Sequence, residues 1–226
     1  MSFLIGAATS GSGKTTLSMG LMRAFCRKGW KVQPFKSGPD YIDTLYHEVA
    51  TGVKSVNLDT FLSSASHVQS LFQRYGCEAD VCLVEGAMGL YDGYDGWHGS
   101  CAEIAMLLDI PVVMVINAKS AAYSVAPLIH GFRTFLPPQT AQCPLRLAGV
   151  VFTRVGSERH LQALQTACKD VGLPCLGYMR QRTDLVVPSR HLGLDITQRA
   201  SIEQLIEMAA NEVEEHVDLE TLLKLE

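Results

Sequence analysis

Residues 8–15, with the sequence ATSGSGKT, have the composition of a loop that binds the phosphates of a nucleotide. Glycines let such a backbone turn so that several N–H groups face one anion. The Lys14 ammonium group supplies a positive charge for the β- and γ-phosphates, and the Thr15 hydroxyl group is suited to ligate Mg²⁺. The pattern departs from the usual one only at Ala8, where glycine is common. This chemistry predicts a nucleoside triphosphate as the ligand.

The surrounding sequence favours this interpretation over a flexible Gly-Ser turn. Apolar residues 3–5 precede the loop, and Leu17, Leu21, Met22 and Phe25 recur at helical spacing after it. The predicted order is therefore strand, loop and helix, which is the context that a phosphate-binding loop requires. The residues predicted to contact the nucleotide are Ser10, Gly11, Ser12, Gly13, Lys14, Thr15 and Thr16.

A second group of polar residues lies in the string KSGPDYID, at residues 36–43, and is followed by His47. Asp40 and Asp43 lie three residues apart beside Lys36, an arrangement suited to binding Mg²⁺ or an anionic substrate. Gly-Pro-Asp is also a good turn, and Asp43 would make a helix cap. The spacing alone leaves both interpretations open.

A third group lies in the string EGAMGLYDG, at residues 85–93. Glu85 ends a predicted strand, where a carboxylate often completes the metal shell of phosphate-loop proteins. The glycines that follow predict close approach of the backbone to a ligand. Asp92 lies beyond them, where it is expected to meet a second substrate. The alternatives are an ordinary strand-end carboxylate for Glu85 and a turn residue for Asp92.

Two basic stretches, residues 180–182 and 188–194, follow the last predicted strand. Their side chains are suited to phosphates, a nucleobase or substrate carboxylates, and solvated surface charge is the alternative. Residues 154–160, with the sequence RVGSERH, are interpreted either as a ligand loop or as a helix start capped by Ser157.

The elements that must position these residues alternate along the chain. The predicted strands are 3–7, 31–35, 81–84, 112–116, 147–152 and 175–178, and the predicted helices are 14–28, 66–75, 101–109, 121–136, 157–170 and 199–215. Runs such as 112–116 lack polar alternation, which is typical of strands covered on both faces. We therefore predict one α/β domain over 1–226, with the three-layer P-loop NTPase fold and a largely parallel central sheet flanked by helices. Right-handed crossovers then bring the loops after the strands to one edge.

Composition narrows the classes of partner. The net charge of −4 provides no basic face for nucleic acid. No apolar run approaches the ~20 residues that cross a membrane. The seven cysteines are scattered and form no Cys-x-x-Cys pair, which favours a reducing, cytoplasmic location.

Several of these strings together resemble one family, the cobyrinic acid a,c-diamide synthases, and specifically their ATP-dependent synthetase domain, in the dethiobiotin-synthetase-like P-loop superfamily. The resemblance runs through nearly the whole chain, over residues 10–15, 37–43 with His47, 85–93, 149–160 and 190–194. The strings SGPDYID and EGAMGLYDG are much more specific than the phosphate loop, which many families share.

The resemblance implies ATP-dependent amidation of the a and c acetate groups of a corrinoid, through an acyl phosphate, in cobalamin biosynthesis. It implies catalytic roles for Lys14, Asp40, Glu85 and Asp92, and a Mg²⁺ site formed by Thr15, Asp40 and Glu85. It implies substrate contacts from Lys36, Tyr41, Ile42, Asp43 and His47, and a further nucleotide contact from Arg190.

The family usually continues into a glutaminase domain, and the resemblance places residues 218–226 at the start of the linker to it. Ammonia is then expected from a glutaminase domain or subunit outside this chain, and a homodimer is left open. Enzymes acting on nickel-sirohydrochlorin or hydrogenobyrinic acid share the same strings and are the alternatives. A partitioning or regulatory ATPase is disfavoured, because its second lysine would stand at position 9, which is Thr9.

Overall fold

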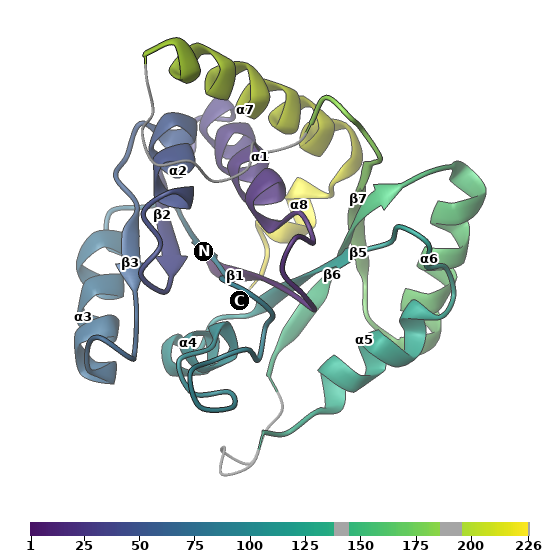
Figure 1. Ribbon diagram of the computed structural model, residues 1–226, viewed down its shortest axis with the longest axis horizontal. Helices are drawn as coiled ribbons and strands as arrows, with labels where there is room; N and C mark the ends of the chain where they lie inside the picture. Colours follow the sequence, from purple (N-terminus) through teal and green to yellow (C-terminus); the bar gives the residue numbers. More distant parts are fainter. Residues whose placement is uncertain (138–144, 186–195, 226) are drawn as a thin grey trace.

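The computed structural model describes residues 1–137, 145–185 and 196–225. Within these residues, seven strands pair in parallel in one sheet, in the order β3-β2-β4-β1-β5-β6-β7. The strands are β1 (Ser2–Ala7), β2 (Val32–Ser37), β3 (Val56–Leu58), β4 (Val81–Glu85), β5 (Val112–Asn117), β6 (Leu147–Val155) and β7 (Cys175–Arg180). Helices cover both faces of the sheet (Figure 1), so the predicted three-layer P-loop fold is confirmed.

The helices of the described residues are α1 (Lys14–Arg27), α2 (Asp43–Thr51), α3 (Ala65–Gly76), α4 (Cys101–Leu108), α5 (Val125–Thr134), α6 (Glu158–Val171), α7 (Ile196–His216) and α8 (Leu219–Leu222). None of them is both long and apolar enough to cross a membrane. Helix α5 begins later than the predicted residue 121. Pro127 fits in its first turn, where the missing N–H of proline would have no helical partner.

The sheet separates two apolar clusters, which explains the continuous apolar character of its strands. Phe3 and Ile5 of β1 pack in the cluster that contains α1 and α7, whereas Leu4 packs in the cluster that contains α3, α4, α5 and α6. Successive side chains of a strand point to opposite faces, so both sets must be apolar. Figure 1 shows α1, α2 and α7 together on one face and α4 and α5 on the other.

Residues 36–47 were assigned to no predicted strand or helix, whereas the structure places the first of them in β2 and the last in α2. Lys36 and Ser37 still belong to β2, because β2 continues to pair with the short strand β3. Helix α2 then begins at Asp43. Its apolar residues Tyr46 and Ala50 lie one helical turn apart and are buried. This turn-length spacing was the available signal for α2, whereas β3 is too short to show a pattern.

The stretch 218–226, predicted to begin a linker, contains the short packed helix α8. Asp218 caps α8, because its Oδ1 accepts a hydrogen bond of 2.9 Å from the Thr221 N–H. Leu219 and Leu222 are buried in the same cluster as α1 and α7. Residues up to Leu222 therefore form part of the domain core.

Helix α7 approaches the backbone of α1 closely at Gly20. A Cβ atom at Gly20 would lie 2.8 Å from the Ala209 carbonyl oxygen and 2.9 Å from a methyl carbon of Val213. A backbone carbonyl cannot move aside as a flexible side chain can. Glycine is therefore required at this position for α1 and α7 to pack as they do.

Gly20→Ala is expected to lower the free energy of unfolding by about 1–3 kcal/mol, because the two helices must separate to accept the methyl group. Urea denaturation followed by circular dichroism measures this change. Gly131→Ala in α5 is the matched control, since a Cβ there meets nothing within 4 Å. The control should leave stability unchanged or raise it by up to about 1 kcal/mol. Equal stability of Gly20→Ala and the native chain would contradict the packing argument.

Candidate functional site

The phosphate loop connects the end of β1 to the start of α1 at the carboxyl edge of the sheet. Gly11 and Gly13 have φ values of 71° and 93°, in the left-handed region that favours glycine. Inside the loop, the Ser12 hydroxyl group donates a hydrogen bond of 2.8 Å to the Thr9 carbonyl oxygen. The loop is thereby held in a shape that leads directly into the N-terminus of α1, where an anion is stabilised.

Strand β6 provides a second support for the loop. The Thr153 hydroxyl group donates a hydrogen bond of 2.7 Å to the Ser12 carbonyl oxygen, and Arg154 donates one of 3.1 Å to the Gly11 carbonyl oxygen. The Thr153 methyl group would lie 3.1 Å from a Cβ at Gly13. Thr153 was not predicted as a site residue. The available signal was a polar residue at the end of an otherwise apolar, buried strand.

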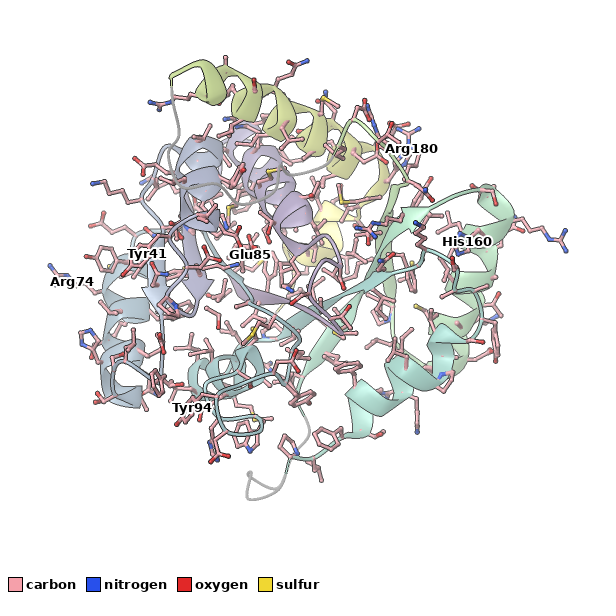
Figure 2. All side chains as sticks on the ribbon, viewed as in Figure 1. Tyr41, Arg74, Glu85, Tyr94, His160 and Arg180 are labelled. Carbon is pink, nitrogen blue, oxygen red and sulfur yellow. The ribbon has the colours of Figure 1, made fainter. Side chains whose placement is uncertain are left out.

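Glu85 lies at the centre of the site, at the end of β4, and its side chain is 0% exposed. The Thr15 hydroxyl group donates a hydrogen bond of 2.7 Å to Glu85 Oε1. Lys36 Nζ lies 2.9 Å from the same oxygen, and His47 Nε2 lies 2.7 Å from Oε2. Three elements, α1, β2 and α2, therefore each place one polar side chain on this carboxylate. Figure 2 shows Glu85 near the centre of the molecule, between Tyr41 and Arg180.

Lys36 is shared between two carboxylates. Its Nζ lies 2.6 Å from Asp43 Oδ2 as well as 2.9 Å from Glu85. Burial opposes the charge of both Lys36 and Glu85, yet the negative neighbours hold the pKa of Lys36 above its usual range, and Lys36 and His47 hold the pKa of Glu85 well below its own. Burial and the nearby Glu85 charge raise the pKa of Asp43. Of these two carboxylates, Glu85 is therefore the one that stays ionised to lower pH.

Lys14 makes a different contact. Its Nζ donates a short hydrogen bond to the Met88 carbonyl oxygen, and burial lowers the pKa of its ammonium group. Met88 has a φ of 45°, in the left-handed region, and the residue is 52% exposed. A non-glycine residue in this region is strained, and such residues gather at functional sites. The loop after β4 is therefore joined to the phosphate loop through Lys14.

These residues line one cavity of about 410 Å³. Its predicted lining residues are Ser10, Gly11, Gly13, Lys14, Thr15, Thr16, Lys36, Ile42, Asp43 and Glu85. The wall also includes residues that were not assigned to the site, namely Tyr46, Gly86, Ala87, Met88, Thr153, Arg154, Met179, Arg180, Arg182 and Leu185. The cavity thus joins the predicted phosphate loop to a second wall formed by β6, β7 and the residues after β7.

Arg180 and Arg182 on this wall are both ion-paired. Arg180 Nη2 lies 3.0 Å from Glu212 Oε2, and Arg182 Nη2 lies 2.7 Å from Asp184 Oδ2. They are therefore more than solvated surface charge, since they border the cavity. Arg190, the predicted nucleotide contact in the same part of the chain, lies outside the described residues. Of the stretch 154–160, Ser157 caps α6 and Arg154 borders the cavity, while the ligand contact of this stretch stays a prediction.

Asp40 lies at the start of α2 and does not line this cavity. Its Oδ1 accepts hydrogen bonds from the N–H groups of Ile42 and Asp43, at 2.8 and 3.1 Å. Asp40 therefore binds the backbone just before and at the first residue of α2, while the Asp43 carboxylate pairs with Lys36. The adjacent Tyr41 is 75% exposed. The predicted metal-binding role of Asp40 stays a prediction.

His47 and Asp92 also lie outside the cavity lining. His47 is fully buried behind Glu85, a position that favours an indirect role over the predicted substrate contact. Asp92 is exposed, and its Oδ2 accepts a hydrogen bond of 2.8 Å from the Gly89 N–H. This contact agrees with the alternative that Asp92 is a turn residue, and it shapes the loop that carries Met88. The catalytic role of Asp92 stays a prediction.

The arrangement fits a magnesium ion that arrives with the phosphates of a nucleotide. Among the described residues, no three His, Cys, Asp or Glu side chains form a group that would hold a metal ion alone. The Thr15 hydroxyl group donates a hydrogen bond to Glu85 and keeps its oxygen lone pairs for a metal. Hydroxyl, carboxylate and phosphate oxygens are the ligands that Mg²⁺ prefers.

Glu85→Gln is expected to flatten the acid dependence of stability. Because the pKa of folded Glu85 lies well below the ordinary value of 4.5, its charge contributes stability above that pH, and this contribution is lost as the pH falls. The raised pKa of Asp43 acts in the opposite direction, and only the part of it that is due to burial remains in the variant, because the Glu85 charge is removed. Urea denaturation between about pH 5 and about pH 3 should show a slope smaller by up to about 1.4 kcal/mol per pH unit in the variant.

The exposed Glu78 provides the matched control for this measurement. Glu78→Gln should retain the native slope, because the carboxylate lies at the surface, where it is solvated. A native slope in Glu85→Gln would show that the buried cluster does not hold the charge of Glu85.

Comparisons with curated proteins agree with the resemblance seen in the sequence. The chain is 41% identical over 227 residues to the cobyrinate a,c-diamide synthase of Listeria innocua, an alignment that covers 98% of the chain and 49% of that protein. It is 40% identical over 222 residues to the hydrogenobyrinate a,c-diamide synthase of Brucella anthropi, covering 97% of the chain and 50% of the relative. The chain thus spans about half the length of these curated relatives.

A comparison with solved structures supports the fold alone. Chloroplast FtsY from Physcomitrella patens superposes with a TM-score of 0.55 at 16% sequence identity, covering 91% of this chain and 64% of that one.

Residues 3–194 match the family described as the CobQ/CobB/MinD/ParA nucleotide binding domain. Since this match includes the phosphate loop, Glu85 and the greater part of the chain, the protein belongs to that family of nucleotide-binding domains.

Proposed function

We propose that this chain carries out ATP-dependent amidation of the a and c acetate groups of a corrinoid. The observation that carries the proposal is the buried cluster of Thr15, Lys36 and Glu85 beside the phosphate loop, on one cavity. The support for the substrate is the identity of about 40% to diamide synthases of two kinds, one named for cobyrinate and one for hydrogenobyrinate.

The proposed reaction has two steps. A substrate carboxylate oxygen attacks the γ-phosphorus of ATP, and the bond to the β–γ bridging oxygen breaks to release ADP. Ammonia then attacks the carbonyl carbon of the acyl phosphate, the C–O bond breaks, phosphate leaves, and the nitrogen loses a proton to water. The first step is needed because a carboxylate repels nucleophiles and offers no adequate leaving group.

Lys14 and the phosphate loop have the central role in the first step. The loop N–H groups and the Lys14 ammonium group would stabilise the charge of the transferring phosphoryl group. Without nucleotide, Lys14 donates to the Met88 carbonyl oxygen. Binding of ATP would therefore exchange this carbonyl for phosphate oxygens and release the strained Met88 loop toward the substrate.

Thr15 and Glu85 would hold the metal side of the site. Bound Mg²⁺ would neutralise charge on the β- and γ-phosphates. The Thr15 oxygen is suited to ligate it directly, while Glu85 accepts the hydrogen bond from Thr15 and fixes the direction of that hydroxyl group. Glu85 itself already accepts three hydrogen bonds, so its main contribution would pass through Thr15.

The exposed side chains of Tyr41 and Met88 offer apolar surface for a macrocycle. Ammonia would be supplied by a glutaminase outside this chain, a proposal supported by relatives about twice as long. The cysteine usage supports a cytoplasmic location.

The test is an amidation assay with ATP, Mg²⁺ and an ammonium salt on cobyrinic acid, hydrogenobyrinic acid and nickel-sirohydrochlorin. Each amidation replaces a carboxyl OH by NH₂ and is read by mass spectrometry. ATP-dependent amidation of a corrinoid is expected, and amidation of nickel-sirohydrochlorin alone would reassign the substrate. No product from any of the three would overturn the proposal. The Lys14→Ala chain is the control for contaminating activity.

Asp92→Asn is expected to lower kcat/KM for amidation by about tenfold, or ~1.4 kcal/mol, while ATP affinity stays near native. The asparagine oxygen retains the hydrogen bond from the Gly89 N–H, so the loop keeps its shape and only the charge is lost. Steady-state kinetics and calorimetric titration with an ATP analogue measure the two effects. An equal loss of ATP affinity would place Asp92 in the nucleotide site instead.

A further inference from the structure

We propose that His47, held by Ser55, is a positioning residue that orients Glu85 for magnesium-dependent nucleotide binding. The inference rests on the proposed function in one respect, namely that the nucleotide is bound with Mg²⁺. His47 does not contact the cavity. Its effect would pass through Glu85 to Thr15, the residue suited to ligate the metal.

The geometry is a line of hydrogen bonds across three elements. His47, in α2, is 0% exposed, and its Nε2 lies 2.7 Å from Glu85 Oε2. Its Nδ1 lies 2.9 Å from the Ser55 hydroxyl oxygen, just before β3. On the other side of the carboxylate, Thr15 donates to Oε1. The line therefore runs from the edge of the sheet to the first turn of α1.

The chemistry of the groups determines which atom donates and which accepts in each of these hydrogen bonds. An ionised carboxylate accepts only, so the ring nitrogen facing it, Nε2, carries a proton. In the neutral ring Nδ1 is then an acceptor, and Ser55 donates to it. This is the arrangement by which a buried partner fixes the tautomer of a histidine. Glu85 Oε2 thus receives its hydrogen bond from a ring whose orientation is itself fixed, while Oε1 accepts from both Thr15 and Lys36.

His47 has a role that Lys36 does not duplicate. Lys36 contacts Oε1, the same oxygen that accepts from Thr15, and is shared with Asp43. Within the described part of the chain, His47 is the group that hydrogen-bonds Oε2. Without His47, Oε2 would be buried without a donor, and the carboxylate would turn to find one. Thr15 would then lose its fixed acceptor, and the direction of its hydroxyl group would no longer be set.

The experiment is calorimetric titration of the full chain with a non-hydrolysable ATP analogue, once with excess Mg²⁺ and once with EDTA. His47→Leu should weaken binding in Mg²⁺ by about 10–100-fold, the range seen when an outer-shell partner of a metal site is lost, and leave binding in EDTA unchanged. Ser55→Ala should weaken binding in Mg²⁺ by about fivefold, as for one neutral hydrogen bond.

Two further variants separate positioning from general damage. His47→Gln places an amide N–H at the position of Nε2 and should restore Mg²⁺-dependent affinity to within about threefold of native. Thr51→Ala, in the same helix, removes a hydrogen bond of 2.8 Å to the His47 carbonyl oxygen but leaves the ring and Glu85 in contact. This matched control should bind as the native chain does in both conditions.

Three results would overturn the inference. They are native Mg²⁺-dependent affinity in His47→Leu, equal losses in Mg²⁺ and EDTA, or an equal loss in Thr51→Ala. If circular dichroism shows that His47→Leu does not fold, Ser55→Ala decides, and native affinity in that variant overturns the inference. The titration contains no corrinoid or ammonia. Failure of the amidation assay therefore leaves this result standing, and the reverse also holds.

Discussion

A fully buried carboxylate at the tip of β4 constrains this protein more than any other group. Glu85 lies where an unpartnered charge would be very costly, so each of its oxygens needs a donor that is placed by another element. Thr15 comes from α1, Lys36 from β2 and His47 from α2. The cluster therefore has its full hydrogen bonding only when β2, α2 and α1 are docked on β4, so the charge of Glu85 and the fold of the site depend on each other.

The phosphate loop is constrained from a second direction. Thr153 and Arg154, at the end of β6, bind carbonyl oxygens of the loop on the side away from Glu85. Between these two supports, Gly11 and Gly13 adopt left-handed conformations that other residues rarely take. The loop is therefore shaped before any nucleotide arrives, which lowers the ordering cost of binding. The Lys14 contact with Met88 then links it to the loop after β4.

The order of strands explains why these groups meet. In the sequence β3-β2-β4-β1-β5-β6-β7, strand β1 lies between β4 and β5. The loop after β1 thus has Glu85 and Lys36 on one side and the β6 residues on the other. Polar residues at the carboxyl ends of parallel strands share one edge, which is where ligands bind in such sheets. The helices on both faces leave that edge open.

Patterns along the chain determined the parts of this protein that depend on neighbouring residues. The apolar runs, the ATSGSGKT loop and the strings around Asp40 and Glu85 were sufficient for the parallel three-layer fold, the family and the main residues of the cavity. The strand end at Glu85 is likewise a local feature. Helix α2 and strand β3 were missed because a specific motif covered the start of one and the other has three residues.

Only the tertiary structure decided which polar residue meets which. The spacing of Asp40 and Asp43 suited a metal site, yet Asp40 accepts hydrogen bonds from the N–H groups of Ile42 and Asp43, and Asp43 pairs with Lys36. His47, expected to touch the substrate, lies behind Glu85, and Thr153 was not expected at all. These pairings join residues far apart in the chain. They depend on the strand order and on the need of each buried charge for a partner. Neither of these can be predicted from the pattern of neighbouring residues.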